Sequence, residues 1–269
     1  MEISAEVILD SISESGVRLT TFALTFPRII LPEFNTHRVF SRNARSTRAV
    51  PTKTLIKEVR DSPFIPIYFG ANRPGMQATE EMSPEQQQRA RDVYLAAARV
   101  AADSAEQLYE LGLHKQHAGR IIEPYTWTHV CVTATEWDNW FYLRDHPDAQ
   151  PEIMVLAQKM KEALDSSTPQ LLVQGEWHLP YVTDAESHYD LITQRKISVA
   201  RCARVSYKTF DGRVSTAEKD IDLYEKLTGE PPHLSPTEHI ATPDPLIEES
   251  HLWGNFNGWV QFRKMVERY

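Results

Sequence analysis

Phe34-Asn-Thr-His-Arg-Val-Phe-Ser-Arg-Asn-Ala-Arg-Ser-Thr-Arg48 is the stretch around which the rest of the chain is organised. Between Glu33 and Glu58 the sequence contains no carboxylate, although the protein as a whole has a net charge of −8. Arginine offers a planar fork of donors that matches phosphate or carboxylate oxygens, and short hydroxyl and amide side chains can close around the same oxygens. The pattern favours an anion-binding segment, while a solvated basic surface accounts for the charges alone equally well.

The overall composition describes a globular protein of one large domain or two small ones. The chain has 269 residues, of which 41% are hydrophobic, and a pI near 5.7. An acidic protein is not expected to bind nucleic acid polymers or anionic membranes, so the basic stretch should serve a small anion. The separated Cys131 and Cys202 fit neither a disulfide framework nor a zinc ribbon. Because the sequence has no signal peptide or membrane-length apolar run, we expect a cytoplasmic protein.

Local patterns predict a mixture of strands and helices. Alternating and β-branched residues predict extended structure over residues 5–9, 19–31 and 126–133. Ser83-Pro84-Glu85-Gln86 has the pattern of a capping box with Pro at the first helical position, which predicts a long helix ending at Gly112. Further helices are expected over residues 135–144, 148–164, 197–207 and 215–229, the last with a Ser215 capping box, and a surface loop over residues 61–82.

The expected long helix carries a small apolar face that suits close helix packing or a subunit interface. This face consists of Val93, Ala97, Val100, Ala101, Leu108 and Leu111.

Histidines occur in two patterns that superficially suggest a metal site. His114 and His117 could share a helical face, but no third ligand is evident. His233-Leu-Ser-Pro-Thr-Glu-His239 lacks the H-E-x-x-H spacing, and a capped turn with solvated histidines is the simpler interpretation. We therefore expect no metal.

Several separate segments resemble one family, the flavin-dependent thymidylate synthases. The signature of that family is Arg-His-Arg, seven further residues and Ser, and here Thr36-His37-Arg38 is followed at the same spacing by Ser46. The segments that resemble other family motifs are Arg120-Ile-Ile-Glu-Pro124, Trp137-Asp-Asn139-Trp-Phe-Tyr-Leu-Arg144 with Ala149-Gln150, Ala203-Arg204-Val-Ser206 and His233-Leu-Ser-Pro-Thr-Glu-His239.

The order of these segments differs from that of most family members, in which the last two precede the signature. The chain is therefore similar to a long, circularly permuted, phage-like form of the family, and such permutation is tolerable because chain ends often lie close together. We expect one domain over residues 1–269. Residues 1–164 would carry the signature and long helices, 165–195 a connector, and 196–269 the permuted FAD-binding segments and tail.

The resemblance implies a fold and an activity. The fold would be α+β, with an antiparallel sheet flanked by helices, assembled as a homotetramer with flavin sites between subunits. The activity would be methyl transfer to C5 of dUMP, making dTMP, with FAD as cofactor and with methylenetetrahydrofolate and NADPH as co-substrates. Alternatives are a related methyl- or hydroxymethyltransferase acting on another pyrimidine nucleotide such as dCMP, and a catalytically inactive nucleotide-binding homologue.

Family positions also imply roles for individual residues. Arg144 and Asn139 would be catalytic, with Arg144 facing the pyrimidine carbonyls and stabilising developing negative charge. FAD would be contacted by His37, Arg38, Asn43, Asn139, Ser206, His233 and Ser235. The nucleotide would be bound by Arg45, Ser46, Thr47, Arg48, Arg120 and Arg144.

Four residues depart from the family pattern around the expected site. Thr36 replaces an Arg, Ala44 a Glu, Glu33 a common Gln, and Thr135 an Arg. In the tail, residues 252–269, Gln261 and Arg263 resemble a Gln and an Arg that precede the signature in the family. We therefore expect the tail to fill part of the altered cofactor pocket.

Overall fold

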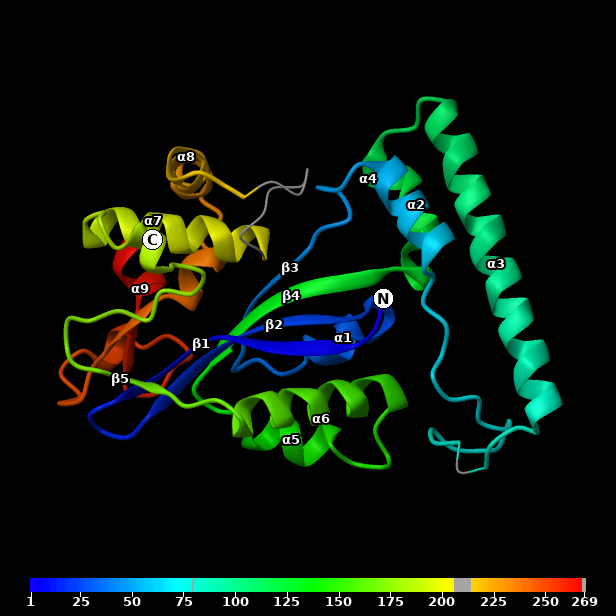
Figure 1. Cartoon of the computed structure of the whole chain (residues 1–269), viewed down its shortest axis with the longest axis horizontal. Helices are drawn as coiled ribbons and strands as arrows, with labels where there is room; N and C mark the ends of the chain where they lie inside the picture. Colours follow the sequence, from blue (N-terminus) through cyan, green and yellow to red (C-terminus); the bar gives the residue numbers. More distant parts are fainter. Residues whose placement is uncertain (79, 206–213, 268–269) are drawn as a thin grey trace.

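A computed structural model describes residues 1–78, 80–205 and 214–267, and its centre is a five-stranded sheet in the order β3-β4-β2-β1-β5 (Figure 1). The strands are β1 (Ser4–Ser13), β2 (Arg18–Pro27), β3 (Ser41–Ala44), β4 (Trp127–Ala134) and β5 (Gln170–Leu172). The first four pair antiparallel, whereas β5 runs parallel to β1. The expected α+β fold is confirmed, with one parallel edge strand added to the expected antiparallel sheet.

The two faces of this sheet differ in chemistry. Phe22, Leu24, Val130 and Val132 point to one face, where they form the largest apolar cluster with α5 (Asp138–Arg144) and α6 (Pro151–Asp165). On β2 and β4 the alternate residues point to the other face, and they include threonines. That second face is buried beneath segments from the C-terminal part of the chain, so its polar groups need hydrogen-bond partners inside the protein.

The C-terminal part folds back over the polar face. It comprises α7 (Leu191–Arg204), α8 (Ala217–Thr228), the 3₁₀ turn η4 (Ser235–His239), a two-stranded sheet of β6 (Ala241–Pro243) and β7 (Trp259–Gln261), and α9 (Phe262–Val266). In Figure 1, α7 and α8 lie on the opposite side of the sheet from α5 and α6. The strands and helices predicted after residue 126 are confirmed in kind. The predicted Ser215 capping box is wrong, because Thr216 is the N-cap of α8 and the Ser215 hydroxyl donates to Asp220 (2.6 Å).

Helix α3 (Pro84–Glu110) lies beside α2 (Thr52–Asp61), at one side of the sheet (Figure 1). Its predicted capping box is present between Ser83 and Gln86. Its apolar face was predicted either to pack within the chain or to form a subunit interface, and packing within the chain is not observed: Ala98, Ala102 and Ala105 are buried against α2, whereas Val93, Val100 and Leu111 are exposed. The subunit interface stays a prediction. Small residues occur all around this helix, so the apolar pattern did not single out the alanine face that permits close approach.

Shorter elements complete the chain. These are η1 (Arg28–Ile30), α1 (Leu31–Phe34), α4 (Lys115–Ala118), η2 (Arg120–Tyr125), η3 (Asp184–Glu186) and η5 (Ser250–Leu252). The extended stretch predicted to reach residue 31 therefore ends at Pro27, and the predicted loop over residues 61–82 is largely without regular structure. Within the described ranges, the helices are all too short or too polar to cross a membrane.

Trp140 is the side chain of α5 that holds the signature segment to the apolar core. It is 1% exposed and contacts Phe34, His37 and Phe40, whereas Tyr142 on the same helix is 81% exposed. We predict that Trp140→Ala lowers the free energy of unfolding by about 3–5 kcal/mol, because it leaves a cavity among these rings. Tyr142→Ala is the matched control and should change it by less than about 0.5 kcal/mol. Urea denaturation measures both, and equal losses would contradict this packing.

Candidate active site on either side of β3

The signature segment forms an edge of the sheet, because β3 pairs with β4 and is the outermost strand. Arg42 fixes the turn that leads into β3. Its guanidinium donates to the backbone oxygens of His37 (3.2 Å) and Phe40 (2.9 Å) and to the Asn35 side chain (2.8 Å). Burial lowers the pKa of Arg42 from its ordinary value. An arginine that was absent from the predicted site therefore shapes the segment that carries it.

Two clefts flank β3 and share Arg42 and Ser235. The first, of about 470 Å³, is lined by Arg38, Phe40, Arg42, Ser235, Glu238, Gly254, Asn255, Gln261, Arg263 and Lys264. The second, of about 310 Å³, is lined by Arg42, Asn43, Ala44, Arg45, Ser46, Ala49, Ala203, Arg204, His233 and Ser235. Among these described lining residues, the first cleft has four cations and one carboxylate, and the second has three arginines and no carboxylate. Both clefts therefore favour anionic ligands.

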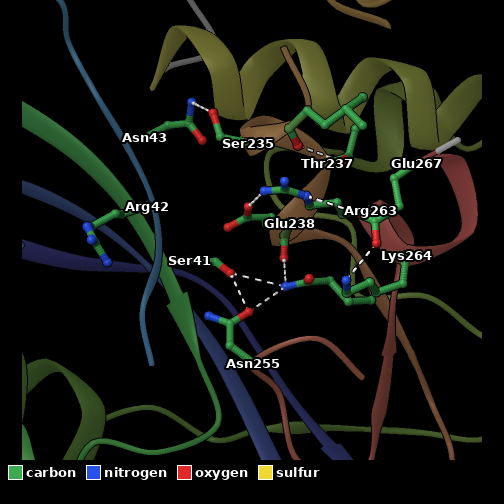
Figure 2. A network of polar contacts seen from close by, with 12 residues as sticks. Ser41, Arg42, Asn43, Ser235, Thr237, Glu238, Asn255, Arg263, Lys264 and Glu267 are labelled. Carbon is green, nitrogen blue, oxygen red and sulfur yellow. Dashed lines mark hydrogen bonds and ion pairs between the residues drawn. The ribbon is translucent and has the colours of Figure 1, made fainter. Parts of the chain in front are cut away.

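The tail builds the far wall of the first cleft. Figure 2 shows Asn255 beside Ser41 and Arg263 beside Glu238. Gln261 Nε2 lies 3.1 Å from Ser41 Oγ and 2.8 Å from Asn255 Oδ1. The tail thus packs against the signature segment. Thr36, where the family pattern has Arg, does not contact the tail in this network, and its hydroxyl lies 3.4 Å from Arg144 Nη2.

A glycine permits this close approach. Gly254 has a φ of +63°, and a Cβ at this position would lie 2.3 Å from Gln261 Oε1. A side chain at residue 254 would therefore both strain the backbone and displace the amide that links the tail to Ser41.

His37 and Arg144 form a polar contact between the turn before β3 and α5. Arg144 Nε donates to His37 Nε2 over 3.0 Å, so this ring nitrogen must be the unprotonated one. The ring lies between Phe40 and Trp140, with centroid distances of 5.6 and 4.8 Å. Burial, followed by the positive charges of Arg144 and Arg42, lowers the pKa of His37 to about 4. At neutral pH His37 is therefore an uncharged acceptor that orients Arg144.

Arg144 also borders a third cleft, of about 780 Å³, that is lined mainly by the start of α6 and by the loop around residues 67–78. Its walls are more apolar than those of the other two clefts, and Glu33 lies among them. Asn139, the other predicted catalytic residue, is exposed on α5 and lines none of the three clefts. The structure therefore brings Arg144 to His37 but leaves Asn139 on the outer surface of its helix.

The residues predicted to bind the nucleotide phosphate are divided. Arg45 and Ser46 line the second cleft, and Arg45 makes a two-pronged ion pair with Glu58 (2.8 and 3.2 Å). The hydroxyl of Thr47 (2.5 Å) and the guanidinium of Arg120 (2.8 Å) instead both donate to Glu123. Arg48 is exposed and lines none of the three clefts described above. A phosphate at Arg45 would have to share that arginine with Glu58.

The residues predicted to bind FAD are also divided, because His37 and Asn139 line neither of the clefts that flank β3. Asn43 Nδ2 donates to Ser235 Oγ (3.2 Å), and Asn43 Oδ1 lies 3.0 Å from His239 Nε2. Arg38 lines the first cleft and His233 the second. Ser206 lies outside the described residues.

Sequence reasoning missed four groups at these clefts, although three of them stand inside motifs that it had singled out. These are Arg42, Arg204, Glu238 and Lys264. Arg204 is placed by the buried Asp220, which accepts hydrogen bonds from it and from Arg201. Lys264 belongs to the tail, where only the proximity of Gln261 and Arg263 in sequence pointed to a role.

The contact between Arg144 and His37 gives a prediction about pH. Between pH 6.5 and about 4 the unfolded chain binds a proton at residue 37 that the folded protein excludes, so stability should fall as the pH falls through this window. In Arg144→Gln the loss of a nearby positive charge should raise the pKa of His37 and narrow the window. NMR titration of the imidazole measures this shift. Arg120→Gln is the control, and an equal shift in both variants would contradict the contact.

Comparisons with known proteins agree with this architecture. A model of the family described as thymidylate synthase complementing protein matches residues 17–170, more than half of the chain. No sequence among the curated proteins matches. The solved structure of the UMP/dUMP methylase PolB from Streptomyces cacaoi bound with 5-Br dUMP is similar, with a TM-score of 0.50 and 17% identity over 61% of this chain and 90% of that one. The same methylase bound with 5-Br UMP gives a TM-score of 0.51 and 18% identity over 61% and 88%.

The two kinds of comparison support different conclusions. At 17–18% identity the structural likeness supports the α+β fold. The sequence match covers β2, β3, β4, α5 and α6, and so includes the whole signature segment. The chain belongs to the thymidylate synthase complementing protein family, the flavin-dependent thymidylate synthases.

Proposed function

We propose that this protein transfers a methyl group to C5 of dUMP, making dTMP, with FAD as cofactor. The observation that carries the proposal is the pair of cation-lined clefts on either side of β3, joined at Arg42 and Ser235. Family membership and the likeness to a methylase bound with 5-Br dUMP support the same conclusion.

The two clefts suit two different anions. FAD carries a diphosphate, and the first cleft offers Arg38, Arg42 and the tail cations around one carboxylate. A nucleotide carries a single phosphate, and the second cleft offers Arg45, Arg204 and the Ser46 hydroxyl. When bound, FAD would relay carbon and hydride between the folate and the nucleotide. In this arrangement Ser235 lies between the two ligands, because it lines both clefts.

Arg144 borders the third cleft and not the second, so we propose that it stabilises charge on the pyrimidine of a nucleotide bound by a neighbouring subunit. Activation of C5 pushes negative charge onto a ring carbonyl oxygen, and a preorganised guanidinium stabilises that charge without reorganising. His37 holds Arg144 through one hydrogen bond and, being uncharged, leaves the positive charge of Arg144 intact. Asn139 would contact a ligand only from the exposed side of α5, which a neighbouring subunit could cover.

We propose methylenetetrahydrofolate and NADPH as co-substrates and a homotetramer as the working form. The exposed Val93, Val100 and Leu111 on α3 support an assembly in which this face is covered. The exposed position of Asn139 supports sites that are completed across subunits.

A second acceptor is favoured by one specific residue. Ala44 lines the second cleft where the family commonly has Glu, so the hydrogen bonds offered to the pyrimidine edge differ there. Uracil and cytosine differ at one such edge, and an altered polar contact can change the choice between them. A methyl- or hydroxymethyltransferase acting on dCMP is therefore the alternative, and an inactive nucleotide-binding homologue is the outcome if neither nucleotide reacts.

We predict that the purified protein is yellow and releases deuterium from C5 of labelled dUMP only when methylenetetrahydrofolate and NADPH are present. Parallel reactions with dUMP and dCMP, read by product mass, identify the acceptor and distinguish methyl from hydroxymethyl products. Arg38→Ala should weaken FAD binding by roughly ten- to a hundredfold, the loss expected for a charged hydrogen bond. Arg60→Ala, which removes two ion pairs between α2 and α3, is the matched control. A colourless protein with no turnover of either nucleotide would refute the proposal.

Subunit sharing gives a separate prediction. If each site combines Arg38 of one subunit with Arg144 of another, then inactive Arg38→Ala and Arg144→Ala proteins should regain part of the activity when co-assembled. The expected ceiling is about a quarter of the wild-type rate, from statistical mixing of the two kinds of subunit. Mixed oligomers verified by mass that stay inactive would argue that each site lies within one chain.

A further inference from the structure

A continuous chain of buried polar side chains crosses the sheet and ends at the clefts. It passes from Ser11 on β1 through His178 to Thr21 on β2, then to Thr133 on β4, His239 on η4 and Asn43 on β3. Successive contacts measure 2.8 Å (Ser11 Oγ to His178 Nδ1), 2.8 Å (His178 Nε2 to Thr21 Oγ1), 2.6 Å (Thr21 Oγ1 to Thr133 Oγ1), 2.8 Å (Thr133 Oγ1 to His239 Nδ1), 3.0 Å (His239 Nε2 to Asn43 Oδ1) and 3.2 Å (Asn43 Nδ2 to Ser235 Oγ). We call this set of seven residues the relay.

The relay belongs to the polar face of the sheet. Thr21 and Thr133 are directly opposite each other on β2 and β4, and Asn43 pairs with the neighbouring Cys131 position. Both histidines and both threonines are fully buried, while Asn43 is 8% exposed. His178 and His239 come from the C-terminal part of the chain, which covers this face. The relay thus connects the core to the cleft that contains Ser235.

The direction of each hydrogen bond follows from the chemistry of its end group. Asn43 Oδ1 can only accept, so His239 Nε2 must carry a hydrogen. In the neutral ring the other nitrogen, Nδ1, then accepts from the Thr133 hydroxyl. Thr133 has a single hydroxyl hydrogen, so the bond between the two threonines is donated by Thr21.

The same reasoning extends to the far end. Thr21 donates to Thr133 and therefore accepts from His178 Nε2, and His178 Nδ1 in turn accepts from Ser11. Burial lowers the pKa of His178 to about 3, so this ring is neutral at physiological pH. Each of the six contacts then has one donor and one acceptor, all in one direction, with both histidines protonated at Nε2.

We propose that the relay is a positioning device that presents the Ser235 hydroxyl as a hydrogen-bond donor to the ligand. In the direction derived above, Asn43 Nδ2 donates to Ser235 Oγ, so the Ser235 hydrogen points to an acceptor oxygen in a cleft. In the opposite direction Ser235 would donate to Asn43 and lose that role. This inference rests on the proposed function only for the nature of the ligand, whose acceptor is a phosphate or carbonyl oxygen.

The length of the relay explains how it holds one direction. If the Asn43 amide alone were turned over, its NH₂ group would face the hydrogen on His239 Nε2. The amide can therefore reverse only if both histidines move their hydrogen from Nε2 to Nδ1 at the same time. Linked hydrogen bonds also polarise one another, which strengthens the set relative to separate pairs. His178 and Thr21 are thus positioning residues for a group that they do not touch.

The first test determines, in the ligand-free protein, the direction in which the hydrogen bonds of the relay are donated. Histidine nitrogen NMR on the full chain, with the two signals assigned by their loss in His178→Asn and His239→Asn, reports which ring nitrogen carries hydrogen. We expect the Nε2-protonated form for both residues. Protonation at Nδ1 in both would show the opposite direction and overturn the proposal, whether or not a ligand binds.

The second test measures how breaking the relay changes the affinity for the ligand. Thr133→Val keeps the shape of the side chain but breaks the relay, so it should weaken FAD or dUMP binding roughly tenfold, as Ser235→Ala should. The double variant should lose no more than either single variant. Thr25→Val is the matched control, because Thr25 makes the same kind of contact with His129 (3.0 Å) on the same two strands outside the relay.

The outcomes separate the two proposals. Equal affinities of Thr133→Val and Thr25→Val, or losses that multiply in the double variant, would overturn the positioning role. A wild-type protein that binds neither FAD nor dUMP would refute the proposed function, and the NMR measurement would still decide the direction of the relay.

Discussion

The short pairing between β3 and β4 is the constraint on which the candidate site depends. Four residue pairs, from Ser41 with Thr133 to Ala44 with Val130, attach the signature to the sheet along one edge only. Clefts can then form on both sides of the strand, because other segments reach it only through side chains. Gln261 does so from the tail, and Ser235 from η4. A central position in the sheet would have buried the same arginines between neighbouring strands.

Several arginines in and around the two clefts are paired with carboxylates before any ligand arrives. Arg45 is paired with Glu58, Arg120 and Thr47 with Glu123, and Arg263 with Glu238. Such pairing stabilises arginines in place and lets an anion replace a carboxylate partner, which favours exchange of ligands over permanent binding. Arg42 differs, since among the described residues its hydrogen bonds go to carbonyl oxygens. A ligand in either cleft would therefore meet the charge of Arg42 without displacing a carboxylate that is hydrogen-bonded to it.

Much of the fold was predictable from local sequence. Alternation predicted β1, β2 and β4, and the Ser83 capping box and the apolar stripe of α6 predicted two helices. The packed face of α3 was not predictable, because alanines occur on several sides of the helix and only contact with α2 distinguishes those that are buried. The parallel strand β5 was missed since its three residues carry too little pattern.

The candidate site was predictable in its parts but not in its pairings. Motif resemblance singled out His37, Asn43, Arg144 and Ser235, and the structure joins them as two contacts, His37 with Arg144 and Asn43 with Ser235. No local sequence pattern predicts that Glu58 binds Arg45, or that His178 in the connector bonds to Thr21 on β2. Such contacts join residues far apart in sequence, and a single chain gives no local signal for them.

The wall of the first cleft has a consequence for how the protein matures. Arg38 and Arg42 emerge early in synthesis, whereas Gln261, Arg263 and Lys264 emerge long after them. The strands that match the family are therefore synthesised well before the tail, and the cleft stays one-sided until the tail arrives. Contacts between distant segments also form slowly. Ligand capture in the first cleft is thereby deferred until the tail has been made, so a product terminated before residue 254 would retain the family signature and lack the far wall of that cleft.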